Sequence, residues 1–115
     1  MRFYIWLDDV RPIPQKVLDY CNENNISALQ VTSVYAAKKL FVQCIRSEDI
    51  YLIDFDHDLG SDESGYDFAK WLLEEEVDPQ YFAIHSMNPV GAKNIHQLLT
   101  HYNWKYLDFG CKNIF

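Results

Sequence analysis

Residues 50–58 read IYLIDFDHD, a short apolar run that is interrupted by Asp54 and followed at once by charged residues. A run of this length that ends at a polar loop over residues 57–64 is typical of a buried strand, so we predict a strand over residues 50–55. Gly60 and Gly65 suit turns in the connection that follows. The segment thus combines a core strand with a loop of chemically reactive side chains at its carboxyl end.

Working outward from this segment, stretches of strand and helix length alternate along the chain. Apolar, aromatic and β-branched residues predict strands over residues 2–8, 26–32, 50–55, 81–85 and 104–109. Apolar residues recur at helical spacing from Gln15, Val34, Phe68 and Pro89 onward, with Thr32 or Ser33 and Asn88 as candidate N-cap residues.

This alternation predicts an α/β fold made of βαβ units. Right-handed crossovers between such units give a parallel sheet that is covered on both faces. We therefore predict a doubly wound, five-stranded parallel sheet in the flavodoxin-like order 2-1-3-4-5. The last helix should be short or absent because few residues follow the fifth strand, and residues 1–115 are expected to form one domain.

Composition narrows the classes of partner. The chain has 115 residues, of which 49% are hydrophobic, which is enough for a core and excludes disorder and fibrous repeats. Its net charge of −7 disfavours an extended nucleic-acid surface and an anionic membrane. The chain shows neither a signal-peptide pattern nor an apolar run of roughly 18 residues. Its three cysteines, which are far apart, are expected to be reduced core thiols, and a cytoplasmic location is expected.

The chemically unusual side chains fall at the carboxyl ends of three predicted strands. Ligands of doubly wound sheets bind beyond these ends, where the strand order reverses. In the predicted order strands one, three and four are neighbours, so these side chains would meet at one opening at the carboxyl edge of the sheet. We call this opening the mouth. They are Asp8, Asp9 and Arg11 at the first strand, Asp54, Asp56, His57 and Asp58 at the third, and His85, Ser86 and Asn88 at the fourth.

Crowded carboxylates need a positive partner. Two of them about 4 Å apart repel by roughly 4 kcal/mol at an effective dielectric near 20, so the cluster must share protons or bind a cation. Carboxylate oxygens are hard ligands, which predicts Mg²⁺ or Mn²⁺. The pattern Asp54-x-Asp-x-Asp lacks the glycine and the terminal glutamate of a calcium loop.

Each of these residues also has a purely structural interpretation. Asp8 and Asp9 could be turn acids, and Asp54 a partly buried strand residue that backbone amides satisfy. The segment 56–58 could be a solvated loop, and His85 a core histidine. Ser86 and Asn88 could be helix-capping groups only.

Three motifs together resemble a known family. The segments LDDVRP (7–12), DFDHDLG (54–60) with SGYD (64–67), and HSMNPVGA (85–92) are similar to those of the cyclic-phosphate processing receiver domains, a family within the response-regulator receiver superfamily. The resemblance covers nearly the whole chain. It implies a receiver fold and a metal-dependent phosphoesterase that acts on cyclic phosphates of nucleotides or RNA ends.

The resemblance also implies roles for single residues. Asp8, Asp9 and Asp56 would hold the metal, with Asp56 favoured over Asp54 by the DHDLG match. The DHD and HSxN segments supply His57, Asp58 and His85 as catalytic residues and Ser86 and Asn88 as substrate-binding residues. The LDDVRP segment adds Arg11, near the mouth, as a further substrate-binding residue. A receiver's lysine at the end of the fifth strand has no clear counterpart, since Lys105 precedes the end of that strand and no proline follows it, so phosphoacceptor behaviour is not expected.

Three functions fit these residues. In the first, a metal-dependent phosphoesterase, His57 and His85 transfer protons to a small nucleotide or to an RNA end that carries a cyclic phosphate. The second is a non-catalytic receiver-like module that binds a metal, a phosphate or an unknown protein partner. The third is a structural protein with a solvated acidic mouth. A phosphoacceptor needs no histidine, so His57 and His85 favour the phosphoesterase.

Overall fold

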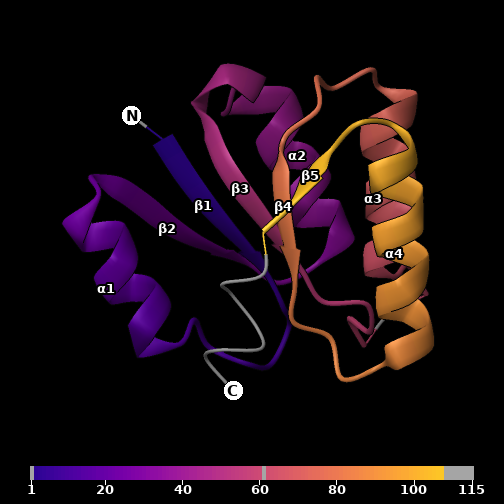
Figure 1. Cartoon of the computed structure of the whole chain (residues 1–115), viewed down its shortest axis with the longest axis horizontal. Coiled ribbons are helices and arrows are strands. Elements are labelled where there is room, and N and C mark those ends of the chain that lie inside the picture. Colours follow the sequence, from indigo (N-terminus) through magenta and orange to yellow (C-terminus); the bar gives the residue numbers. More distant parts are fainter. Residues whose placement is uncertain (1, 61, 108–115) are drawn as a thin grey trace.

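The computed structural model describes residues 2–60 and 62–107. Its elements alternate along the chain as predicted (Figure 1). They are β1 (Arg2–Leu7), α1 (Gln15–Glu23), β2 (Ile26–Val31), α2 (Val34–Gln43), the 3₁₀ turn η1 (Ser47–Asp49), β3 (Ile50–Phe55), α3 (Gly65–Glu74), β4 (Tyr81–Ile84), α4 (Pro89–His101) and β5 (Lys105–Tyr106).

The five strands form one parallel sheet in the order β2-β1-β3-β4-β5. This confirms the predicted doubly wound, receiver-like arrangement. The fifth strand is shorter than the predicted 104–109, since only Lys105–Tyr106 pair with β4 among the described residues. The prediction that a further helix is short or absent concerns residues 108–115, which lie outside the described residues.

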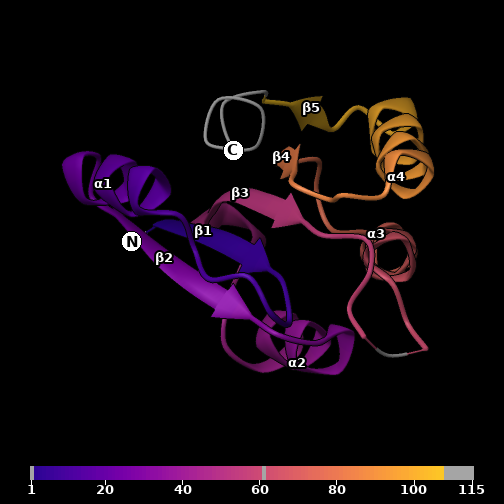
Figure 2. The same ribbon diagram turned by 90° about the horizontal axis from the view of Figure 1, so that it is seen from below.

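Helices cover both faces of the sheet, with α1 on one side and α2 and α3 on the other (Figure 2). A hydrophobic core lies on each face. The larger core packs α2, α3 and α4 against one face, around Phe55, Phe68 and Phe82. The smaller core packs Val17 and Cys21 of α1 against the other face. Because side chains alternate along a strand, Tyr4 and Trp6 of β1 point into this smaller core while Ile5 and Leu7 point into the larger one.

Side-chain caps fix where three helices begin. The hydroxyl of Ser33 accepts a hydrogen bond from the Ala36 amide at the start of α2, and Asn88 accepts one from the Gly91 amide at the start of α4. Both confirm the predicted N-caps, and Pro89 occupies the first turn of α4. Ser64 and Asp67 form a reciprocal capping box at α3, which anchors the end of the β3–α3 loop.

The structure also tests the expectations for the cysteines and for membrane-spanning segments. Cys21 is buried, and burial raises the pKa of its thiol to about 11, as expected for an inert core thiol. Cys44 is exposed at the end of α2, so the expectation of a core thiol is wrong there, and Cys111 lies outside the described residues. Within the described ranges, every helix is too short or too polar to cross a membrane.

Candidate functional site

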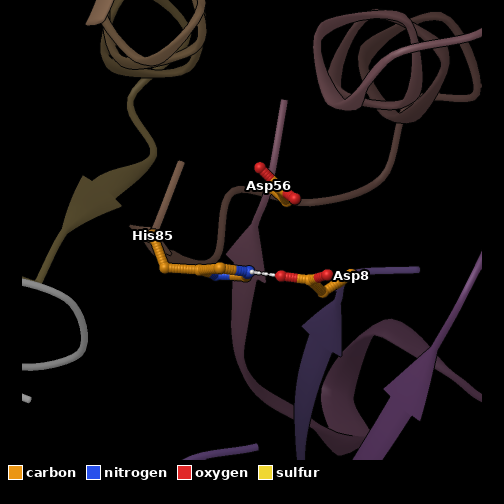
Figure 3. A group of neighbouring side chains, drawn as sticks. All are labelled: Asp8, Asp56 and His85. Carbon is orange, nitrogen blue, oxygen red and sulfur yellow. Dashed lines mark hydrogen bonds and ion pairs between the residues drawn. The ribbon is translucent and has the colours of Figure 1, made fainter. Parts of the chain in front are cut away.

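Strand register brings Asp8, Asp56 and His85 together. The last residues of three adjacent strands, Leu7, Phe55 and Ile84, are partners in the sheet. The sheet hydrogen bonds continue one residue further, since the Asp56 amide donates to Leu7 and the His85 amide to Phe55. The next residue of each strand therefore lies at the same carboxyl edge, as Figure 3 shows. We call Asp8, Asp56 and His85 the inner cluster; one ligand atom from each lies within 4.8 Å of the others.

Asp8 organises the β1–α1 loop. Its Oδ1 accepts hydrogen bonds from the backbone amides of Val10 at 2.9 Å and Arg11 at 2.7 Å. Its Oδ2 lies 3.0 Å from Nε2 of His85. This buried carboxylate therefore has both the turn-forming role of the structural interpretation and a place in the inner cluster.

Asp54 lies inside β3 and below the mouth, on the face of the sheet that carries Tyr4 and Trp6. It is fully buried, and two side chains contact it: the Tyr4 hydroxyl donates to Oδ2 at 2.5 Å, and Nδ1 of His85 lies 2.8 Å from Oδ1. The structural interpretation of Asp54 named only backbone amides and did not include these two side-chain partners. Sequence reasoning did not connect Tyr4 or Trp6 to the site, although their alternation along residues 2–8 places them on one face of the sheet.

Asp56 is the half-buried member of the inner cluster. Burial raises the pKa of its carboxyl above the usual value, and the nearby charge of Asp8 raises it further. His85, the backbone amide of His57 and Arg11 act in the opposite direction. The surroundings of Asp56 therefore disfavour its ionised form.

The inner cluster fits a divalent cation. Ligand atoms about 2.1 Å from an octahedral ion lie about 3.0 Å apart when adjacent and about 4.2 Å apart when opposite. The 3.0 Å separation of Asp8 Oδ2 and His85 Nε2 is that of an adjacent pair, and the three ligand atoms all lie within 4.8 Å of one another. Two carboxylates and an imidazole are donors that such ions accept.

Three other predicted site residues lie in the loops after β1 and β4. Asp9 is exposed, and its carboxylate packs on Gly60, whose φ of +66° and lack of a Cβ allow the approach; a Cβ there would meet Oδ2 at 2.6 Å. The Arg11 guanidinium donates to the backbone oxygen of His85 at 3.0 Å, which links the loops after β1 and β4. The Ser86 hydroxyl accepts from the Asn88 amide at 3.0 Å.

His57, Asp58 and Asn88 form a second set, which we call the outer group. Nδ1 of His57 lies 3.0 Å from Oδ1 of Asp58, and the Asn88 amide group lies 3.4 Å from the other oxygen of Asp58. The hydrogen bond with His57 lowers the pKa of Asp58 below its usual value. His57 is half-buried whereas Asp58 is exposed. The outer group therefore faces solvent, whereas the side chain of His85 is fully buried.

Gly91 in the first turn of α4 leaves the space in which the His57 ring packs. A Cβ at this position would lie 2.3 Å from Cγ and 2.7 Å from Nδ1 of that ring. We expect Gly91→Ala to displace the ring while leaving the fold intact, because alanine is favoured over glycine in a helix by about 1 kcal/mol. In NMR spectra the His57 side-chain signals should move and those of exposed His101 should not. Unchanged His57 signals would contradict this packing.

The comparisons with known proteins agree with this geometry. The family model described as "Cyclic-phosphate processing Receiver domain" matches residues 3–101. A search of curated protein sequences gives no match.

Solved receiver domains share the fold. A response regulator receiver protein from Pseudomonas putida matches with a TM-score of 0.68 at 16% identity, covering 99% of this chain and 88% of that chain. The response regulator TrrA from Thermotoga maritima, solved in complex with Mg(2+)-BeF, matches with a TM-score of 0.63 at 15% identity, covering 93% and 85%. The receiver domain of the Francisella response regulator 1452 gives 0.57 at 17% identity, covering 90% and 94%. At these identities the likeness concerns the fold.

Proposed function

The chain belongs to the family of cyclic-phosphate processing receiver domains, and from this premise we propose that it is a metal-dependent phosphoesterase that opens cyclic phosphates of small nucleotides or RNA ends. The observation that carries the proposal is the outer group, because it adds a half-buried histidine, oriented by a carboxylate, to the loop that directly follows Asp56. A phosphoacceptor site has no need of such a group, whereas hydrolysis requires a group that moves protons.

The cation of this proposal is Mg²⁺ or Mn²⁺, held by Asp8 and Asp56. TrrA, which has the same fold, is solved in complex with Mg(2+)-BeF, and this supports a divalent ion in the proposal. Asp9 stays a predicted further ligand, although its carboxylate lies against Gly60. When bound, a divalent ion would polarise a phosphoryl oxygen and lower the pKa of a bound water.

His57 is the residue that we assign to proton transfer. With Nδ1–H donated to Asp58, the lone pair of its imidazole is on Nε2. Nε2 takes one proton from the attacking water, whose oxygen bonds to phosphorus while the bond between phosphorus and the ring ester oxygen breaks. His57 then returns the proton to that leaving oxygen, so one water is consumed and a phosphomonoester with a free hydroxyl forms. Asp58 accepts the Nδ1 hydrogen and so keeps His57 in the tautomer whose lone pair is on Nε2. Its negative charge also balances the positive charge of the imidazolium.

Substrate phosphate would be held at the start of α4. The first amides of a helix and its positive dipole end favour anions. The Ser86 oxygen already accepts from the Asn88 amide, so its hydroxyl proton can be donated to a phosphate oxygen. Asn88 caps α4 through Oδ1 and directs its amide group toward Asp58, and the Arg11 guanidinium adds positive charge near the mouth.

The test is turnover of 2′,3′-cyclic nucleotides and of RNA that ends in a cyclic phosphate, with Mn²⁺ or Mg²⁺ present. Phosphorus NMR should show conversion of the cyclic diester to a monoester only when the ion is added. Absence of turnover on these substrates and on linear phosphodiesters, by protein that binds the ion, would leave the non-catalytic receiver-like module as the function.

A further inference from the structure

We propose that Asp54 is a positioning residue that makes His85 the third ligand of the cation, beside Asp8 and Asp56, and that this nitrogen ligand gives the site a preference for Mn²⁺ over Mg²⁺. The inference rests on the cation site of the proposed function. It gives a role to Asp54 and a different role to His85 from the proton transfer predicted from the sequence.

The His85 ring is fixed from three sides. Its Nδ1 lies 2.8 Å from Asp54, and its face stacks on the Trp6 ring with 3.7 Å between centroids and 7° between planes. The Tyr4 hydroxyl holds the other oxygen of Asp54. All of these side chains are buried. Rotating the ring would leave two buried carboxylates facing carbon atoms, so one orientation is strongly preferred.

This orientation points a single nitrogen at the inner cluster. Asp54 as a carboxylate can only accept, so Nδ1 carries the hydrogen of that contact. Nε2 then lies 3.0 Å from an oxygen of Asp8 and within 4.8 Å of an oxygen of Asp56. Two lone pairs do not face one another at 3.0 Å without positive charge between them. Either a proton or a metal ion must supply that charge, and a divalent ion satisfies all three ligand atoms at once.

The contact between Asp54 and His85 has the form that orients metal-binding histidines. Such histidines donate the hydrogen of the second ring nitrogen to a carboxylate or a carbonyl, which fixes the tautomer and raises the basicity of the ligand nitrogen. Imidazole nitrogen binds first-row transition ions better than it binds Mg²⁺, which prefers oxygen ligands and retained waters. A set of two carboxylates and one imidazole therefore favours Mn²⁺ over Mg²⁺.

Burial separates the roles of the two histidines. The His85 side chain is fully buried and both of its ring nitrogens face carboxylates, so it offers no nitrogen to a substrate. His57 is half-buried and has one nitrogen with a carboxylate partner. We therefore assign the ion to His85 and the substrate to His57.

The test is pulsed EPR of the full chain loaded with Mn²⁺ alone. Wild type should show hyperfine coupling of the ion to a nitrogen nucleus, and His57→Ala should keep that coupling while His85→Gln should lose it. In Asp54→Asn the side-chain amide can donate to Nδ1 and move the ring hydrogen to Nε2. We expect Mn²⁺ affinity to fall by about tenfold or more in that variant, with a smaller change in Mg²⁺ affinity.

The outcomes separate this inference from the proposed function. Mn²⁺ bound by wild type without nitrogen coupling, or equal affinity for Mn²⁺ and Mg²⁺, would overturn the inference and leave a site made of carboxylates. Failure of wild type to bind either ion would overturn the proposed cation site as well. If Asp54→Asn does not fold, the wild-type spectrum and Tyr4→Phe still decide. Tyr4→Phe removes the hydroxyl that holds Asp54, so Mn²⁺ affinity should fall in it while Mg²⁺ affinity changes less; unchanged Mn²⁺ affinity would contradict the positioning role.

Discussion

Adding Mn²⁺ or Mg²⁺ to the ion-free protein is expected to raise its melting temperature by roughly 10 °C. An ion that binds only the folded chain stabilises it by about 2.7 kcal/mol at one hundred times Kd, which corresponds to a shift of this size in a domain of about 100 residues. In Asp56→Asn most of the rise should vanish, because that substitution removes a ligand from the inner cluster. Thermal unfolding followed by circular dichroism with increasing ion concentration measures both effects.

The control is Asp78→Asn, which removes an exposed carboxylate from the α3–β4 connection, before the amino end of β4. It should respond to ions as wild type does. Equal responses of wild type and Asp56→Asn would mean that the ions bind elsewhere.

Without ions, the Asp56→Asn substitution should have the opposite effect on stability. Burial and Asp8 raise the pKa of Asp56 in the folded chain, so the folded state holds this proton more tightly than the unfolded state does. The stability contributed by that proton is fully present below the usual value of 3.8 and is lost as the pH rises through the folded pKa. Ion-free Asp56→Asn should therefore melt above wild type near neutral pH, and the difference should shrink on acidification.

The sheet could be predicted because its signals are local. Apolar runs of strand length and the caps Ser33 and Asn88 are readable within a few residues, and right-handed crossovers leave few strand orders. The carboxyl edge follows from that order, so the meeting of Asp8, Asp56 and His85 could be expected before their register was known. The turn η1 was not predicted because it is a single short turn without hydrophobic periodicity.

The extent to which each side chain at this edge is buried could not be predicted from the sequence. Which face a strand residue occupies depends on pairing with neighbours distant in sequence, and this pairing places Asp54 beside Tyr4 and His85. The sequence pattern treats Asp8 and Asp9 alike, yet the backbone turn buries Asp8 and exposes Asp9. Asn88 shows that structural and functional interpretations coexist, since one side chain caps α4 and contacts Asp58.

Replacing His57 by alanine is expected to lower the rate of cyclic-phosphate hydrolysis by about 10²- to 10⁴-fold, the usual cost of losing a positioned proton-transfer group. The reason lies in its geometry: Asp58 fixes Nδ1 at 3.0 Å, Gly91 seats the ring, and the side chain is partly open to solvent. Steady-state kinetics at saturating Mn²⁺ measures the loss as a fall in kcat. The melting temperature should fall less than in His85→Gln, because the His57 side chain is 21% exposed whereas that of His85 is fully buried.

A comparison with His85→Gln decides whether the fall in kcat of His57→Ala comes from lost proton transfer or from weaker ion binding. If His57 acts on substrate and His85 on the ion, His57→Ala should lower kcat without changing Mn²⁺ affinity, whereas His85→Gln should weaken Mn²⁺ binding and lower stability. His101→Ala, which removes an exposed histidine at the end of α4, should leave both quantities unchanged. Turnover by folded His57→Ala at the wild-type rate would exclude its role in proton transfer. A loss of Mn²⁺ affinity in His57→Ala would instead place this histidine at the ion, because a group that only moves substrate protons has no differential contact with the ion-bound state.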